Sequence, residues 1–292
     1  MPTLYLLAGP TASGKTTYSI AFAKQHNCEI LSCDASAFYQ GMDIGTAKPS
    51  YKEQQQVKHW GIDILPPNAY FSIKDFVSYS QGVIADITKR GKDVCIVGGS
   101  GFYLKSFLAP VVDEIEASYE VKKQIDSLDQ AEGLSGCLKL LKQLNHSLPD
   151  NFDSKNPLKV KKALERCLTT GKTLIELKNQ FDRQPPPYSS YNKQVFLFSK
   201  PTELLRLSVR LRTQAMLERG LLSEVENLLQ ANLLQPLMPA AQAIGYRESI
   251  AYIKNPTNIK ILENEITKNT YELIKKQSTW FRNQIKVDRY IY

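Results

Sequence analysis

The 292-residue sequence has little that could build a metal centre or a disulfide framework. Only three histidines could assist its five cysteines, which include no C-x-x-C pair: Cys28, Cys33, Cys95, Cys137 and Cys167. Cysteines scattered in this way are typical of reduced thiols in an intracellular protein. We therefore expect free cysteines and no cysteine–histidine metal site.

Long hydrophobic runs are also absent. The first apolar run, residues 4–8, is far too short for a membrane span or for the core of a signal peptide, and no charged leader precedes it. We therefore predict a soluble, cytoplasmic protein with no membrane partner. Acidic residues are the minority charge: 29 Asp and Glu stand against 37 Lys and Arg, a net charge of +8 that favours a polyanionic partner.

Four short apolar runs have the character of buried strands, at residues 4–8, 29–34, 93–99 and 195–199. Glycine follows the first run and ends the third, and a helix-like segment comes after each. Continuous apolar runs of this length are typical of parallel strands covered on both faces. The sequence therefore predicts an α/β fold with a parallel sheet, whose functional residues gather at the carboxyl ends of the strands.

The segment between the third and fourth runs differs in texture. From about residue 113 it is polar and helical, with one helix expected through residues 155–178, and the proline-rich stretch 184–192 ends it. We therefore predict a catalytic core of residues 1–112 and 193–292, interrupted by a mostly helical insertion at residues 113–192. The rest of the chain, from residue 203, is expected to be mostly amphipathic helix.

A phosphate-binding motif follows the first predicted strand. The segment GPTASGKT, residues 9–16, fits the pattern G-x-x-x-x-G-K-[ST] at every position. In such a loop the backbone N–H groups and a helix N-terminus face one anion, while Lys15 supplies a charge and the Thr16 hydroxyl a ligand for Mg²⁺. The sequence therefore predicts a diphosphate or polyphosphate site formed by Gly9, Pro10, Thr11, Ala12, Ser13, Gly14, Lys15 and Thr16.

One carboxylate lies at the end of a predicted strand. An enzyme that transfers phosphoryl groups with this motif usually has such a residue for its Mg²⁺, but the third strand ends in VGGSG. The strand-end carboxylate is instead Asp34, after the second strand. Two interpretations remain open: Asp34 is a helix N-cap, or it is a general base or metal-shell acid close to the phosphates.

Two further segments each allow a structural and a functional interpretation. The loop 41–49, GMDIGTAKP, is either a surface turn or a site that offers the Thr46 hydroxyl and the Lys48 amine. Residues 155–178 hold seven basic side chains against two acidic ones. Such a run is either a solvated helix face or a contact with a phosphate backbone.

The C-terminal region adds basic and aromatic residues. Arg210 and Arg212 lie early in one predicted helix, and Trp280 and Phe281 lie among lysines and an arginine in another. The aromatic pair is either a core anchor or, together with its basic neighbours, a surface that stacks on nucleic acid.

Seven motifs follow one another along almost the whole chain: GPTASGKT, a strand ending in Asp34, GMDIGTAKP, VGGSGFYLK, GKTLIEL, AIGYRE and KKQSTWFR. This ordered set resembles the tRNA dimethylallyltransferases, also called tRNA isopentenyltransferases or the IPP transferase family. The resemblance implies a fold like that of phosphate-loop nucleotide kinases, with a mobile helical insertion that grips the anticodon arm of tRNA. It also implies transfer of a dimethylallyl group from dimethylallyl diphosphate to the N6 amine of the adenosine immediately 3′ of the anticodon, position 37, with release of diphosphate.

The resemblance further implies roles for individual residues. Asp34 would take the proton from the adenine amine, and Arg212 would be a second clamp on the diphosphate, which residues 11–16 hold with Mg²⁺ on Thr16. The expected tRNA contacts are Asp34, Ala35, Ser36, Ala37, Ser100, Lys122, Lys159, Lys162 and Arg247. The enzyme is expected to act as a monomer.

Several of these positions depart from the usual pattern of the family. DASAFY stands for DSxxxY, so Ala35 lacks the usual hydroxyl, and Ser100 replaces a more usual threonine. Ser208 replaces a frequent arginine. Lys159 and Lys162 stand where arginines are common, and lysine keeps the charge but loses the forked geometry.

Two other functions share parts of the pattern. An ATP-dependent small-molecule kinase would also use residues 9–16, although the missing carboxylate on the third strand weighs against it; whether ATP competes for the loop is left open. A prenyltransferase acting on free adenine nucleotides would use the same chemistry. The large basic insertion favours RNA as the acceptor.

Overall fold

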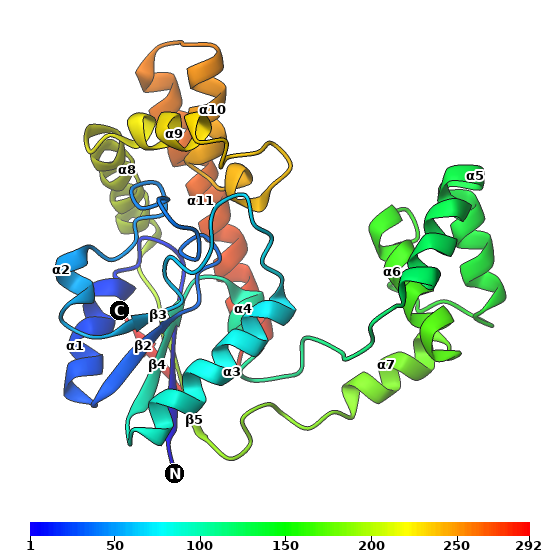
Figure 1. Ribbon diagram of the computed structural model, residues 1–292. Coiled ribbons are helices and arrows are strands. Elements are labelled where there is room, and N and C mark those ends of the chain that lie inside the picture. Colours follow the sequence, from blue (N-terminus) through cyan, green and yellow to red (C-terminus); the bar gives the residue numbers. More distant parts are fainter. The chain divides into compact units, whose positions relative to one another are not determined.

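Six parallel strands form one sheet in the computed structural model, which describes residues 1–292 (Figure 1). The strand order is β3-β2-β4-β1-β5-β6. Along the chain the strands are β1 Thr3–Ala8, β2 Cys28–Ser32, β3 His59–Trp60, β4 Asp93–Gly98, β5 Asn192–Phe198 and β6 Arg289–Ile291. The predicted α/β class with a parallel sheet is confirmed.

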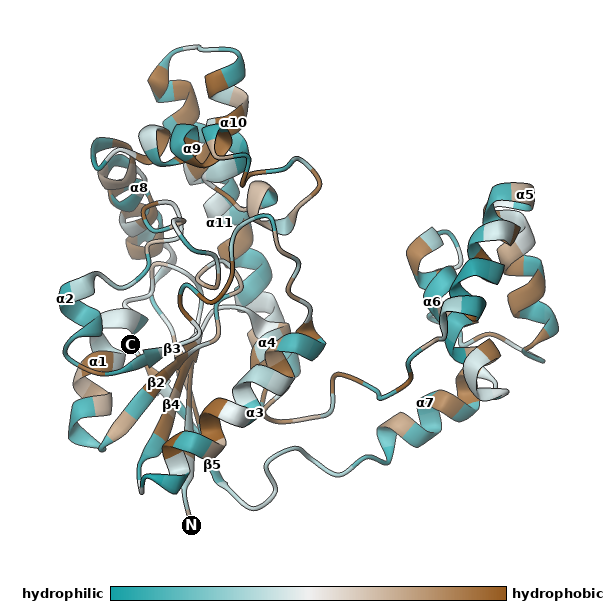
Figure 2. Cartoon of the chain, in the orientation of Figure 1, coloured by the Kyte–Doolittle hydropathy of each residue, from teal (hydrophilic) through white to brown (hydrophobic).

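The centre of the sheet explains the continuous apolar runs. β1 lies between β4 and β5, and Leu4, Leu6 and Leu7 are fully buried. Figure 2 shows apolar residues gathered on these strands. The edge strands β3 and β6 were not predicted, because two or three residues are too few to show a hydrophobic pattern.

Helices cover both faces of the sheet. On one face, α1 (Lys15–Gln25) packs against a core that includes Leu7. On the other face, α3 (Ile73–Lys89), α4 (Gly101–Lys105) and α11 (Ile259–Gln284) contribute to a core that includes Leu4 and Leu6. Alternate side chains of β1 therefore enter opposite cores, as the two-residue period of a strand requires.

A third core lies among the C-terminal helices α8 (Thr202–Glu218), α9 (Leu221–Gln230) and α10 (Tyr246–Lys254) and the 3₁₀ helix Pro239–Gln242. It includes Met42 and Tyr246, which are both fully buried. The loop 41–49 therefore packs into a core at one end and is more than a surface turn. The loop leads into the short helix α2 (Tyr51–Gln54).

The ends of β2 and β4 meet closely at the edge where the site forms. A Cβ atom at Gly98 would overlap the carbonyl of Cys33, so only glycine allows this approach. The Cys33 amide donates to the Val97 carbonyl at 2.7 Å, which fixes the turn just before Asp34.

Residues 109–186 form a separate unit with its own core. Its helices are α5 (Tyr119–Gln143), kinked at Gly133, α6 (Pro157–Thr170) and α7 (Leu174–Asp182). The unit begins and ends somewhat earlier than the predicted insertion, 113–192.

The expectation of one helix through residues 155–178 is wrong. Gly171 adopts a left-handed conformation with φ of 67° and ends α6. A capping box between Thr173 and Glu176 then starts α7.

None of the helices combines the length and the apolar composition that crossing a bilayer would require. The five cysteines are buried free thiols.

Candidate active site

The phosphate loop, residues 9–16, connects β1 to α1 at the carboxyl edge of the sheet. The Lys15 ammonium folds back over it and donates to the carbonyls of Gly9 at 2.8 Å and Pro10 at 2.7 Å. It also lies 3.4 Å from the Ser13 hydroxyl. The ammonium of Lys15 is therefore held by the backbone of its own loop.

Lys15 has an unusual protonation equilibrium. Burial of the ammonium lowers its pKa to about 7, the Asp34 carboxylate opposes this shift, and the Arg212 guanidinium adds to it. A diphosphate placed beside the amine would restore the charged form, because opposite charges favour it.

Arg212 reaches the loop from α8. Its Nη1 donates to the Thr11 hydroxyl at 2.9 Å, and its Nη2 donates to the Thr46 carbonyl at 3.2 Å. The fork of the guanidinium is thus fixed by one residue of the phosphate loop and one residue of the loop 41–49. Arg212, which was predicted to be a second clamp, thus lies beside the phosphate loop.

Gln277 of α11 joins the phosphate loop to the end of β4. Its side-chain oxygen accepts from the Thr11 amide at 3.0 Å, and its nitrogen donates to the Gly99 carbonyl at 2.9 Å. We did not predict this role, although Gln277 lies three residues before Trp280 and hence on the same face of the helix.

Asp34 follows β2 by two residues and faces the phosphate loop. No helix begins there: its carboxylate accepts from the Ser36 amide at 3.0 Å and caps a turn instead. The Ala35 amide donates to the Ser100 hydroxyl at 3.3 Å, which ties this turn to the start of α4. The helix N-cap interpretation is therefore wrong for Asp34, and the interpretation as a group acting beside the phosphates remains.

Two cavities of about 420 Å³ each meet at this point. They share six lining residues: Thr11, Asp34, Thr46, Gly99, Arg212 and Gln277. The second cavity continues along the phosphate loop, from Ala12 to Thr16. The first continues between α8 and α11, where apolar side chains, among them Met216, Ile266 and Trp280, form part of its lining.

This arrangement sets a carboxylate and a guanidinium on the boundary between an anion site and a cavity that is partly apolar. A ligand with a diphosphate head and a hydrocarbon tail fits across the boundary, head in the second cavity and tail in the first. A proton donor that enters the first cavity would meet Asp34 next to the bond between head and tail.

The predicted nucleic-acid contacts of the sheet unit lie in several different places. Ser36 and Ser100 line the first cavity, and Ala37 lines the second. Ala35 is packed against the core. Arg247 is exposed on α10, where Glu248 binds it at 2.7 Å.

The predicted contacts in the helical unit are exposed basic side chains. Lys122 lies on α5, and Lys159 and Lys162 lie on α6. Lys159 pairs with Asp153 at 3.4 Å, and Lys162 with Glu165 at 2.6 Å. Acidic neighbours thus partly neutralise the basic run, while its ammonium groups stay open to solvent.

A metal ion would find few protein ligands here. No three His, Cys, Asp or Glu side chains are grouped so that they could hold one. Mg²⁺ does not need such a cage, because it commonly takes one or two protein ligands and completes its shell with phosphate oxygens and water. Thr16 in the second cavity fits that pattern.

The comparisons with known proteins agree on one family. The sequence model described as "IPP transferase" matches residues 37–284. A tRNA dimethylallyltransferase of Opitutus terrae is 41% identical over 284 residues, which cover 97% of this chain and 91% of that protein. A tRNA dimethylallyltransferase of Francisella tularensis subsp. tularensis is 35% identical over 283 residues, covering 96% of this chain and 90% of that one.

Solved structures give the same result. The chain is similar to tRNA delta(2)-isopentenylpyrophosphate transferase from Staphylococcus epidermidis, with a TM-score of 0.67 and 34% identity over 99% of this chain and 92% of that one. A eukaryotic dimethylallyltransferase acting on tRNA has a TM-score of 0.85, over 96% of this chain and 70% of that one. Its identity of 21% supports the fold alone.

Proposed function

The chain belongs to the IPP transferase family, and on that premise we propose that it transfers a dimethylallyl group to tRNA. The donor is dimethylallyl diphosphate. The acceptor is the exocyclic N6 amine of the adenosine immediately 3′ of the anticodon, position 37, and diphosphate is released.

One observation carries this proposal: the two cavities share six lining residues and therefore meet at a common boundary. The phosphate loop and Arg212 hold the diphosphate in the second cavity, and the five-carbon chain extends into the first, among Met216, Ile266 and Trp280. The C–O bond that breaks then lies where the two cavities meet, beside Asp34. An acceptor amine that enters from the first cavity approaches the carbon on the side opposite the leaving group.

Asp34 supplies the base. The lone pair of an adenine amine is delocalised into the ring, so the amine is a weak nucleophile until a proton is removed. As the new N–C bond forms and the C–O bond to diphosphate breaks, the amine proton passes to the Asp34 carboxylate. The hydrogen bond from the Ser36 amide keeps that carboxylate facing the cavity.

Negative charge develops on the departing diphosphate, and the groups of the phosphate loop are placed to stabilise it. The loop amides, Lys15 and the two donors of Arg212 surround the second cavity and are in place before the reaction. Mg²⁺, held through the Thr16 hydroxyl and the diphosphate oxygens, would add charge neutralisation there.

The tRNA must present an unstacked adenine, which costs least in a single-stranded loop. We propose that Asp34, Ala35, Ser36, Ala37 and Ser100 contact the flipped nucleotide and its neighbours. Lys122, Lys159 and Lys162 in the helical unit and Arg247 on α10 would contact the anticodon arm, mainly through its phosphates.

We further propose that the enzyme acts in the cytoplasm and as a monomer. None of the five buried cysteines is paired in a disulfide, which is usual for an intracellular protein.

The two alternative functions are less well supported. β4 ends in Gly98 without a carboxylate, and Glu53, the second acidic side chain of the phosphate cavity, is occupied in the capping box of α2 with Ser50. Neither the end of β4 nor Glu53 therefore offers a carboxylate where a kinase would need one to hold Mg²⁺. An enzyme that prenylates free adenine nucleotides would not need the helical unit of residues 109–186.

A transfer assay separates the three functions. Labelled dimethylallyl diphosphate is incubated with the protein and undermodified tRNA without ATP, and in parallel with AMP as acceptor. Label in tRNA supports the proposal, whereas label in AMP alone would support the nucleotide prenyltransferase. ATP-dependent phosphorylation of a small acceptor, with no label in RNA, would support the kinase.

A further inference from the structure

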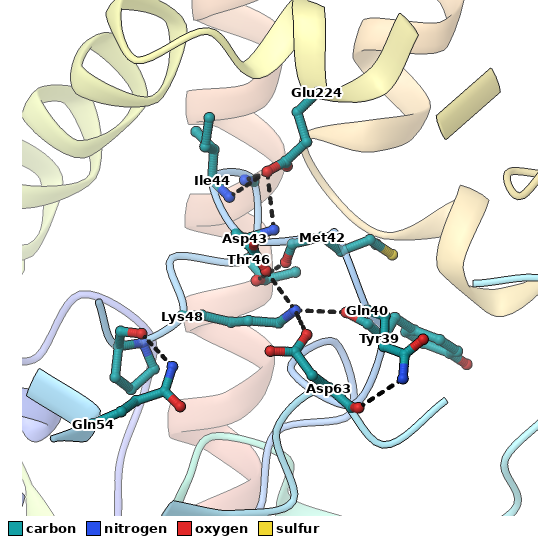
Figure 3. Close-up of polar contacts among 12 residues, drawn as sticks. Tyr39, Gln40, Met42, Asp43, Ile44, Thr46, Lys48, Gln54, Asp63 and Glu224 are labelled. Carbon is teal, nitrogen blue, oxygen red and sulfur yellow. Dashed lines mark hydrogen bonds and ion pairs between the residues drawn. The ribbon is translucent and has the colours of Figure 1, made fainter. Parts of the chain in front are cut away.

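The carboxylate of Glu224 binds a loop of backbone. In Figure 3 it reaches from α9 to residues 43–45, where it accepts from the amides of Asp43 at 3.0 Å, Ile44 at 2.8 Å and Gly45 at 3.2 Å. The Tyr246 hydroxyl is a fourth donor, at 2.5 Å. Three consecutive amides that converge on one point form an anion-binding nest, and here the anion belongs to the protein.

The same loop is anchored from its other side by Lys48. The Lys48 side chain is 2% exposed, and its ammonium binds the carboxylates of Asp43 at 2.7 Å and Asp63 at 2.5 Å (Figure 3). It also donates to the Tyr39 carbonyl at 2.5 Å. The short segment between Glu224 and Lys48 is thus held at both ends.

Thr46 lies between these two anchors. Its carbonyl accepts from Nη2 of Arg212 at 3.2 Å, and its hydroxyl donates to the Met42 carbonyl at 2.5 Å. Immediately before it, Gly45 is so close to the ring of Tyr246 that a Cβ atom would overlap it. The position of the Thr46 carbonyl, and with it one of the two contacts that orient Arg212, therefore depends on the seating of the loop against α9 and α10.

We propose that Glu224 is a positioning residue for the diphosphate clamp: by holding residues 43–45 it fixes the Thr46 carbonyl, which orients Arg212. The inference rests on the proposed function, because it assigns Arg212 to the diphosphate. Glu224 lines neither cavity and acts only through the loop.

The chemistry of the nest explains why a carboxylate is needed. Each of its two oxygens accepts two hydrogen bonds, Oε2 from Asp43 and Ile44 and Oε1 from Gly45 and Tyr246. In Glu224→Gln one oxygen becomes an NH₂ group, so at least one of the three backbone amides loses its acceptor. A partly buried amide left without a partner then favours a displaced loop.

The test is a double-mutant cycle on diphosphate binding, measured by calorimetric titration with inorganic diphosphate. The four proteins are the wild type, E224Q, R212A and the double variant. In the protein that retains Arg212, E224Q should weaken diphosphate binding about tenfold, which is the cost of one misplaced charged hydrogen bond. In the R212A background it should weaken binding less than about twofold, because the route from Glu224 to the ligand is gone.

Glu29→Gln is the matched structural control. Glu29 is also a carboxylate in the same unit whose two oxygens each accept two hydrogen bonds. It is 2% exposed and bound by Arg90, Lys92 and Trp60, but it lines neither cavity. E29Q should lower the unfolding midpoint as E224Q does and leave diphosphate binding unchanged. If E224Q does not yield folded protein, Glu224→Asp, which keeps the charge and withdraws it from the loop, takes its place in the cycle.

Each outcome decides between the two claims. Equal weakening by E224Q with and without Arg212, or no weakening at all, overturns the positioning role and leaves the proposed function standing. Wild-type protein that fails to bind diphosphate contradicts the proposed function and the inference with it. Product formation from dimethylallyl diphosphate and tRNA, followed separately in the wild type, tests the proposed function alone.

Discussion

The guanidinium of Arg212 donates a hydrogen bond to the hydroxyl of Thr11 at 2.9 Å, across 201 positions of sequence. This contact closes α8 over the phosphate loop and sets Arg212 between the two cavities. Its second donor, to the Thr46 carbonyl, fixes the plane of the guanidinium. A diphosphate in the loop would therefore meet a group that is already oriented, which lowers the cost of binding it.

Replacing Arg212 by lysine should lower kcat/KM for dimethylallyl diphosphate by about 10- to 100-fold, because an ammonium keeps the charge but cannot form both contacts at once. Steady-state kinetics with saturating tRNA measure this loss. Arg210→Lys is the matched control: it lies two residues earlier on α8, is 69% exposed and only approaches Glu263 at 4.0 Å. An equal loss of kcat/KM in both variants would show that the overall positive charge of α8, and not the two-pronged guanidinium of Arg212, determines activity.

Replacing Asp34 by asparagine should lower kcat by about 10²- to 10⁴-fold, the usual range for loss of a general base. The asparagine oxygen can still accept from the Ser36 amide, so the turn should keep its shape. Diphosphate binding should not weaken, because a like charge is removed from its surroundings. Single-turnover rates and calorimetry provide the two measurements, and turnover close to the wild-type rate would exclude Asp34 as the base.

The affinity for diphosphate should depend on pH through Lys15. Burial holds the pKa of Lys15 at about 7 in the free protein, and the bound anion raises that pKa. Above pH 7 binding must therefore take up a proton, and affinity should fall as pH rises, by up to about tenfold per pH unit, until the pKa of the complex is reached.

Lys15→Arg is the control for this pH dependence, because arginine stays charged throughout the range. The titration of diphosphate itself is common to both proteins, so the difference between their curves isolates the lysine. Parallel curves for the wild type and the variant between pH 7 and 9 would contradict the assignment.

Removing Lys159 and Lys162 together should weaken tRNA binding and reduce its dependence on salt. If both contact phosphates, K159Q/K162Q should lower the slope of log affinity against log salt concentration by about one to two units. Filter binding over a range of KCl concentrations measures the slope. Lys161→Gln is the control from the same helix, since Lys161 is 26% exposed and pairs with Asp126 and Asp129. A slope that changes equally in both proteins would exclude a specific role for the two lysines.

Local patterns predicted much of the architecture. Strands β1, β2, β4 and β5 were visible as buried apolar runs, and the phosphate loop was visible as a motif, because both signals lie within a few consecutive residues. The break between α6 and α7 was missed even though Gly171 marks it. A single glycine inside a periodic helical pattern can also be tolerated, so the pattern alone favoured continuity.

The set of residues that lines both cavities could not be predicted from local patterns. Thr11, Asp34, Thr46, Gly99, Arg212 and Gln277 come from six separate parts of the chain. Residue patterns left the role of Asp34 open, and the role of Arg212 came from the resemblance to a family. The contacts of Gln277 and Glu224 depend on how α11 and α9 pack on the loops, which only tertiary structure determines.

Nucleoside analysis of the reacted tRNA tests the central claim most directly. Undermodified tRNA is incubated with the protein and dimethylallyl diphosphate, digested to nucleosides and analysed by mass spectrometry, while released diphosphate is measured in the same reaction. The account predicts a dimethylallyl group on the N6 amine of the adenosine at position 37, with one diphosphate released for each modified nucleoside. Unmodified adenosine at that position, or a phosphorylated product that requires ATP, would contradict it.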